Sequence, residues 1–151
     1  MDGSSTALGI PRAAVELFES ARRMMVHASA VSDVNLRYSL AHRAALRTAA
    51  GVLAVRATKA AATPRARARQ SRPQSAWVLL RRVAPQMGEW ADYFATHAPI
   101  REAAEAGSSL ITARMADDAI RDAAAFLCDA IVVARGSGPI ADSSAVTMRA
   151  G

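Results

Sequence analysis

The sequence has little of what marks secreted, membrane-spanning or disulfide-stabilised proteins. It contains one cysteine, Cys128, so a disulfide within the chain is excluded and a reducing compartment is indicated. Runs of about 18 apolar residues, the length that a membrane-spanning helix needs, do not occur. The start of the chain lacks the basic segment and the apolar stretch of a signal peptide. We therefore expect a cytoplasmic protein with no membrane partner.

Motifs for metal, cofactor and covalent chemistry are missing as well. There is no Gly-rich phosphate loop, Ser-His-Asp set or zinc motif, and His27 and His97 have no partner at metal-ligand spacing. Asp118 and Asp122 are four residues apart in a predicted helix, but two arginines lie within helical reach, which favours surface ion pairs. Cys128 lies in an apolar stretch without an activating neighbour and is predicted to be buried. We expect no metal and no cofactor.

Alanine is present in large excess, at 37 of 151 positions. It is the strongest helix former, and its small side chain lets helices pack closely. Arginine outnumbers lysine 18 to 1. GC-rich codons explain both biases, so the arginine excess alone does not indicate nucleic-acid binding.

The positive charge is concentrated in the first part of the chain. Residues 1–85 carry 14 basic and 4 acidic side chains, a net charge of +10, and residues 86–151 carry 5 and 9, a net charge of −4, which together give the +6 of the whole chain. Such asymmetry is typical of a surface for a charged partner. It is equally typical of two halves that attract each other within a chain or across a dimer.

Apolar residues recur at helical spacing, and no segment shows the alternation of a strand. The predicted helices cover residues 11–29, 32 or 33 to about 60, 74 or 75 to 97 with an interruption at Pro85, 99 to about 107, and 112–135. Ser32 or Asp33 is expected to cap the second helix, Thr112 to cap the last, and Gly136 to end it. We predict an all-α bundle of about five helices over residues 11–135, with a disordered segment 1–10 and a flexible tail 136–151.

The helical stripes predict which side chains form the core. They comprise Val15, Phe18, Met25 and Val26, then Tyr38, His42, Ala45, Leu46, Ala49, Val52 and Leu53, and finally Met115, Ala119, Ile120, Ala123, Leu127, Ala130, Ile131 and Ala134. The aromatic residues Trp77, Trp90, Tyr93 and Phe94 are also expected to pack in the core. Gly51 weakens its helix slightly, and we expect it to allow close approach of a neighbouring backbone.

Residues 63–73 interrupt the helical pattern, because two prolines bracket four arginines. With the two arginines that follow, they form the densest positive cluster: Arg65, Arg67, Arg69, Arg72, Arg81 and Arg82. Such a cluster is a candidate for binding the phosphates of RNA or DNA. No aromatic residue is interleaved in the segment, so base stacking has no local support there. A solvated loop explains the cluster equally well.

The long second helix contains Arg37 and His42, an Arg-x4-His spacing, within Ser32–Ala62. This helix, followed by Ser75–Ala95, resembles the HEPN superfamily, and in particular a poorly characterised branch from high-GC bacteria. The resemblance covers roughly residues 11–135 and implies a helical bundle that forms homodimers. It also implies that Arg37 and His42 are the candidate catalytic pair of a metal-independent ribonuclease, in which the histidine acts near the 2′-hydroxyl and the arginine stabilises phosphate charge.

Helix geometry separates these two residues. Five positions turn an α-helix through about 500°, so Arg37 and His42 point about 140° apart. His42 lies on the apolar stripe with Leu46 and Leu53, as a structural histidine does. In active HEPN nucleases the motif usually lies in a later helix with a polar residue after the arginine, whereas here Tyr38 follows it.

The sequence therefore supports three functions in order. The first is a HEPN-like module that binds nucleic acid or nucleotide without strong catalysis, in stress, defence or DNA maintenance. The second is a metal-independent endoribonuclease that uses Arg37 and His42. The third is an adaptor that binds a protein partner through the helix with Trp90, Tyr93 and Phe94. We predict no enzymatic activity for the first and third, and a homodimer for the first two.

Overall fold

The computed structural model describes residues 9–60 and 75–136, and for residues 58–60 the backbone alone. These residues form helices and no strand, which confirms the predicted all-α bundle. The elements are α2 (Arg12–Ala30), α3 (Val34–Ala60), α5 (Ala76–Val83), the short 3-10 helix η1 (Pro85–Met87), α6 (Gly88–Glu105) and α7 (Ala113–Arg135). Among the described residues, no helix is both long and apolar enough to cross a membrane.

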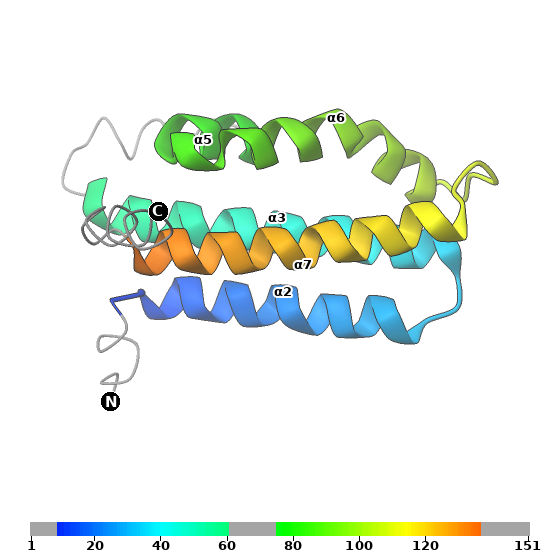
Figure 1. The fold of residues 1–151 in the computed structure, drawn as a ribbon, viewed down its shortest axis with the longest axis horizontal. Coiled ribbons are helices and arrows are strands. Elements are labelled where there is room, and N and C mark those ends of the chain that lie inside the picture. The colour runs from blue at the N-terminus through cyan, green and yellow to red at the C-terminus, as the bar shows by residue number, and fades with distance from the viewer. Residues whose placement is uncertain (1–8, 61–74, 137–151) are drawn as a thin grey trace, which may run out of the picture.

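Helix α3 is the centre of the bundle, and it contacts each of the other four α-helices. Figure 1 shows three layers, with α2 on one side, α3 and α7 side by side in the middle, and α5 with α6 on the other side. Both α6 and α7 pack on α3. Side chains from these three helices therefore meet in one region.

Hydrogen bonds from short polar side chains fix the starts of the helices. Asp33 Oδ1 accepts from the backbone N–H groups of Asn35 (2.9 Å) and Leu36 (3.2 Å), and Thr112 Oγ1 accepts from that of Met115 (3.1 Å). Both caps agree with the sequence prediction. Gly136 is the C-cap of α7, as predicted.

The two internal prolines behave differently, and one prediction fails here. Pro85 separates α5 from α6, as expected for a residue that lacks an N–H and clashes with the preceding turn. Pro99, however, does not begin a new helix: α6 runs through it without interruption to Glu105. Pro99 and Ala95, whose carbonyl loses its helical donor, are both exposed, so water can satisfy that carbonyl.

Alanine dominates the core, and aromatic rings fill the remaining space. The largest fully buried side chains are Phe126, Leu80, Val52 and Thr48. Trp77 and Phe94 are buried and stacked, with ring centroids 5.0 Å apart, and Phe126 packs against both. Trp90 and Tyr93 are half-buried. The predicted core role of the aromatic residues is confirmed.

Two side chains predicted to be buried are exposed. Val26 is 66% exposed because α2 buries the face with Phe18, Ala21 and Met25 instead. Cys128 is also exposed, since α7 directs its neighbours Phe126 and Leu127 into the core. A cysteine in an apolar stretch was therefore assigned to the wrong helix face.

Gly51 allows a close approach, but by a side chain and not by a backbone. A Cβ atom added at Gly51 would lie 2.3 Å from Cε1 of Phe18, a distance that no packed structure tolerates. The Phe18 ring is 6% exposed and lies against the α3 backbone. Gly51 thus joins α2 to α3.

The ends of the domain differ partly from the prediction. Ile10, assigned to the disordered segment 1–10, is 4% exposed and belongs to the core cluster, so the domain begins before Pro11. Residues 1–8, the predicted loop 63–73 and residues 137–151 of the predicted tail lie outside the described residues.

Candidate functional site

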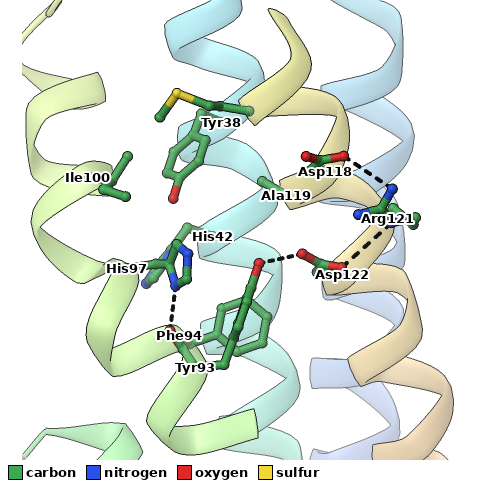
Figure 2. A pocket seen from close by; sticks show the side chains of 11 residues that line it. Tyr38, His42, Tyr93, Phe94, His97, Ile100, Asp118, Ala119, Arg121 and Asp122 are labelled. Carbon is green, nitrogen blue, oxygen red and sulfur yellow. Dashed lines mark hydrogen bonds and ion pairs between the residues drawn. The ribbon is translucent and has the colours of Figure 1, made fainter. Parts of the chain in front are cut away.

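A cavity of about 340 Å³ opens between α6 and α7, with α3 as its floor. This volume is within the range of small-molecule sites, about 300–1,000 Å³. Figure 2 shows the lining side chains converging from the three helices. They are Tyr38, His42, Tyr93, Phe94, His97, Ile100, Met115, Asp118, Ala119, Arg121 and Asp122.

Helical spacing places the polar groups of the cavity. On each contributing helix two of them are four residues apart and share one face: Tyr38 and His42 on α3, Tyr93 and His97 on α6, Asp118 and Asp122 on α7. Because α6 and α7 both pack on α3, the three faces meet. The site is therefore set by the packing of the helices.

His42 is buried at the floor of the cavity, with 3% of its surface exposed. Its ring meets Trp77 and Phe94 edge to face, with centroids 5.9 and 5.8 Å away. No hydrogen bond joins it to another described residue. Burial, together with the charge of Arg101 and with His97, lowers the pKa of His42 to about 4. The imidazole is therefore neutral near pH 7 and keeps its hydrogen-bonding groups for the cavity.

His97 is half-buried beside the cavity and is held in one tautomer. Its Nδ1 lies 2.6 Å from the backbone oxygen of Tyr93. Since a carbonyl oxygen only accepts, Nδ1 carries the proton, and in the neutral ring Nε2 is left as an acceptor. The ring also packs on that of Tyr93, with centroids 4.2 Å apart. His97 thus offers an oriented acceptor to a ligand.

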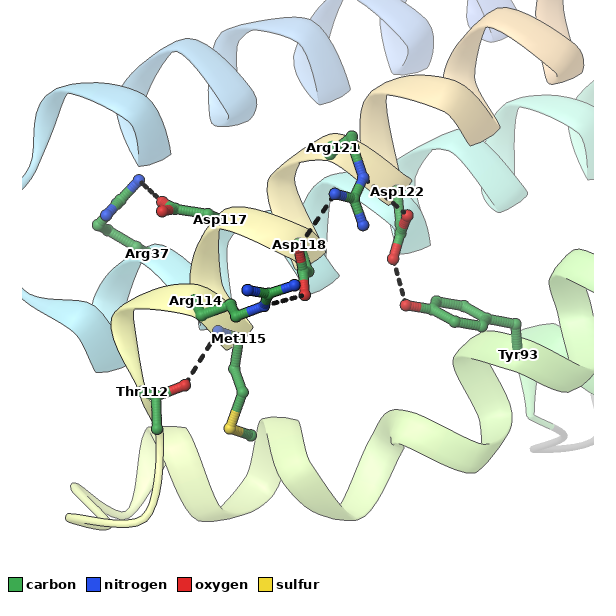
Figure 3. A network of polar contacts seen from close by, with 9 residues as sticks. All are labelled: Arg37, Tyr93, Thr112, Arg114, Met115, Asp117, Asp118, Arg121 and Asp122. Atoms are coloured by element: carbon green, nitrogen blue, oxygen red, sulfur yellow. Dashed lines mark hydrogen bonds and ion pairs between the residues drawn. The ribbon is translucent and has the colours of Figure 1, made fainter.

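The tyrosines and carboxylates complete the polar lining. The Tyr93 hydroxyl donates to Asp122, and burial, with this carboxylate, raises the pKa of Tyr93. Burial also raises the pKa of Tyr38, which forms no hydrogen bond with another described side chain. Arg121 lies 3.1 Å from Asp118 and 3.7 Å from Asp122, and these contacts appear in Figure 3. With both histidines neutral, the cavity has one more negative than positive side chain.

Arg37 lies outside this cavity, although His42 is part of it. Its Nη2 is 2.5 Å from Asp117 Oδ1, and its Nε donates to the backbone oxygen of Ala28 at 3.3 Å. Figure 3 shows Arg37 and Asp117 apart from the Asp122–Tyr93 contact. Arg37 holds α3 to α2 and α7, whereas His42 faces α5 and α6. One chain does not bring the predicted catalytic pair together.

The predicted phosphate-binding arginines are only partly described. Arg65, Arg67, Arg69 and Arg72 lie outside the described residues. Arg81 pairs with Asp92 on α6, and Arg82 is exposed on α5. Arg37–Asp117, Arg43–Glu105 and Arg81–Asp92 all join the basic half of the chain to the acidic half. Attraction within the chain therefore accounts for part of the charge asymmetry.

Sequence reasoning missed most of the cavity. It considered Asp118 and Asp122 as a metal pair and preferred surface ion pairs; Arg114 and Arg121 do approach Asp118. It left Tyr93 and His97 without a site. The signal was present as i, i+4 pairs of polar and aromatic residues on three helices, but the sequence does not say which helices face each other.

The arrangement favours binding over metal chemistry. Among the described residues, no group of three or more His, Cys, Asp and Glu side chains could hold a metal ion. The cavity instead combines aromatic and apolar walls with a few oriented hydrogen-bonding groups, the usual character of a site for an organic ligand.

Comparison with known proteins gives one match. A family model described as SAV_6107-like HEPN matches residues 28–131, more than half of the chain. The matched segment includes every residue that lines the cavity, and Arg37. No curated protein and no solved structure matches the chain.

Proposed function

Because the chain belongs to the SAV_6107-like HEPN family, we propose that it is a HEPN module that binds a nucleotide unit, free or within RNA or DNA, without cleaving it. The observation that carries this proposal is the cavity between α6 and α7. It holds a buried histidine with no hydrogen bond to another described residue, beside a histidine with an oriented acceptor. Buried polar groups are normally paired, so these groups indicate a ligand.

A nucleobase fits the lining of the cavity. Tyr38, Tyr93 and Phe94 present aromatic surface, and His97 and Asp118 present hydrogen-bond acceptors. A flat heterocycle needs both, because its faces stack on rings and its edge exchanges hydrogen bonds. The charge of the lining argues against a phosphate inside the cavity. The phosphate is proposed to remain outside, near Arg121, whose side chain is 70% exposed.

Several features support binding without cleavage. Arg37 is engaged by Asp117 and Ala28, away from His42. A second subunit would not easily supply a replacement, since His42 is 3% exposed behind the aromatic rings. The lowered pKa of His42 also makes it a weak general base near neutral pH. A ribonuclease that uses Arg37 and His42 is therefore the weaker proposal.

A protein adaptor that uses the aromatic helix is also a weaker proposal. Phe94 is 3% exposed, and Trp90 and Tyr93 turn their polar atoms to Asp129 and Asp122. These aromatic side chains pack inward on α3, α5 and α7, so α6 does not present them as a docking surface.

The proposal is tested with a short fluorescent single-stranded RNA in EDTA, by anisotropy and by gel electrophoresis of the same samples. We expect binding, no cleavage, and at least about tenfold weaker binding by the cavity variant His97→Ala. His27→Ala is the matched control, since His27 is exposed on α2 away from the cavity, and it should bind as the parent does. Absence of binding, or equal loss in both variants, would remove the proposal. Cleavage abolished by His42→Ala and by Arg37→Ala would favour the nuclease.

A further inference from the structure

The lining of the α6–α7 cavity has more hydrogen-bond acceptors than donors. The two carboxylates, Asp118 and Asp122, accept only, and Nε2 of neutral His97 accepts as well. The donors are fewer: Arg121 is shared between the carboxylates, and the Tyr93 hydroxyl is given to Asp122. A ligand that complements this lining must itself be rich in donors.

Asp118 is the carboxylate best placed to accept from a ligand. Its Oδ1 accepts from Arg121, but its Oδ2 has only Arg114 Nε at 4.0 Å, too far for a hydrogen bond. Each carboxylate oxygen has two lone pairs, so the group keeps free acceptor capacity. Asp122 has less, because the Tyr93 hydroxyl already occupies its Oδ2.

The four common bases differ in how they meet a carboxylate. Guanine alone presents two adjacent donors, N1–H and the N2 amino group, which match the two oxygens of one carboxylate as a bidentate pair. Adenine and cytosine each place a ring-nitrogen acceptor beside the amino group, and uracil places its single N–H between two carbonyl oxygens. In these three bases an acceptor would face the carboxylate, at an energetic cost.

We infer that the α6–α7 cavity selects guanine, with the Asp118 carboxylate accepting from N1–H and N2. This inference rests on the proposed nucleotide-binding function and specifies its ligand. A second observation supports a ligand in the cavity independently of the acidic pair: His42 is 3% exposed, lines the cavity and has no hydrogen bond to another described residue. The Tyr38 hydroxyl, directed into the cavity in Figure 2, is available to donate to O6 of guanine.

Calorimetric titration of the protein with GMP, IMP and AMP in EDTA tests the inference. GMP should bind at least about tenfold more tightly than AMP, because one bidentate pair distinguishes bases by that factor or more. IMP has N1–H and O6 but no N2 amino group, so it should fall between them. Equal affinity for GMP and AMP would overturn guanine selection while leaving nucleotide binding intact. No binding of any of the three would remove the proposed function and this inference together.

The assignment to Asp118 is tested by Asp118→Asn, whose amide replaces one of the two acceptors by a donor. The preference for GMP over AMP should fall to about twofold or less. Asp117→Asn is the matched control, because it removes the same charge from the next residue of α7, which lies outside the cavity and contacts Arg37. It should keep the parent's preference. An unchanged preference in Asp118→Asn would overturn the assignment, and the comparison of GMP with IMP on the unmodified protein tests the N2 contact without any variant.

Discussion

At the scale of single residues, His42 links burial directly to ionisation. Its pKa is lowered from 6.5 to about 4 in the folded protein, first by burial and then by Arg101 and His97. Between these two values the unfolded chain binds more protons than the folded one. Stability contributed by neutral His42 is therefore fully present above pH 6.5 and is lost as the pH falls to about 4.

We predict that this histidine makes the free energy of unfolding fall by roughly 2–3 kcal/mol between pH 7 and pH 4, in addition to the effect of the carboxylates. Urea unfolding at a series of pH values measures the fall. His42→Leu should remove this part of the pH dependence, and His27→Leu, at an exposed position, should retain it. Identical pH profiles for the parent and His42→Leu would contradict the assignment of the lowered pKa.

Gly51 gives a second prediction at this scale. Gly51→Ala places a methyl group where the Phe18 ring lies, and should lower the free energy of unfolding by about 1–3 kcal/mol through overpacking. Chemical denaturation measures the loss. The double variant Gly51→Ala with Phe18→Leu should lose less than the sum of the two single variants, because the smaller side chain relieves the clash. Strict additivity would show that the two residues do not interact.

The helical stripes predict burial at most positions of the core, but not at all of them. A stripe gives the direction of the apolar face to within about one position, and this is why Cys128 and Val26 were assigned to the core. Ile10 was missed for the opposite reason, since a single apolar residue before a helix has no periodicity. Only the packed neighbours decide these cases.

At the scale of the helices, Pro99 is the feature that the sequence misjudged. It lies inside α6, where its ring removes one hydrogen bond from the helix. Pro99→Ala restores the missing N–H at an exposed position, and should raise the free energy of unfolding by about 1–3 kcal/mol. Thermal and urea unfolding measure the gain.

Pro85→Ala provides the control for this prediction. Pro85 is the first residue of η1, where a missing N–H costs little, so its replacement should change stability by less than about 1 kcal/mol. If Pro99→Ala destabilised the protein as much as Pro85→Ala or more, α6 would not be continuous through residue 99.

The starts of the helices were predictable because their caps are local. Asp33 and Thr112 bond to backbone groups two or three residues ahead, so the sequence contains the complete interaction. The two prolines were not separable in this way. Both have the same local effect, and whether a helix ends or continues depends on the solvent around the freed carbonyl and on packing against α3.

At the scale of the whole molecule, the bundle was predictable and the site was not. Periodicity and alanine content give an all-α fold without knowledge of contacts. The cavity requires residues from α3, α6 and α7 that are up to 84 positions apart, from Tyr38 to Asp122. No local pattern predicts that convergence. The prediction instead paired Arg37 with His42, which are close in sequence but serve different sides of α3.

The charge asymmetry also acquires a meaning only at this scale. Ion pairs join the basic half to the acidic half within one chain, at the surface, where each contributes less than about 1 kcal/mol. The homodimer and a phosphate-binding role of Arg65, Arg67, Arg69 and Arg72 stay predictions. Neither is needed to form the cavity between α6 and α7.

The central claim is that this cavity receives a nucleobase, and intermolecular nuclear Overhauser effects between the protein and GMP test it most directly. We predict contacts from the base proton H8 or the ribose H1′ to ring protons of Tyr38, Tyr93 or Phe94, and no turnover of the nucleotide. Contacts confined to other surfaces, with unchanged resonances for these three rings, would contradict the claim.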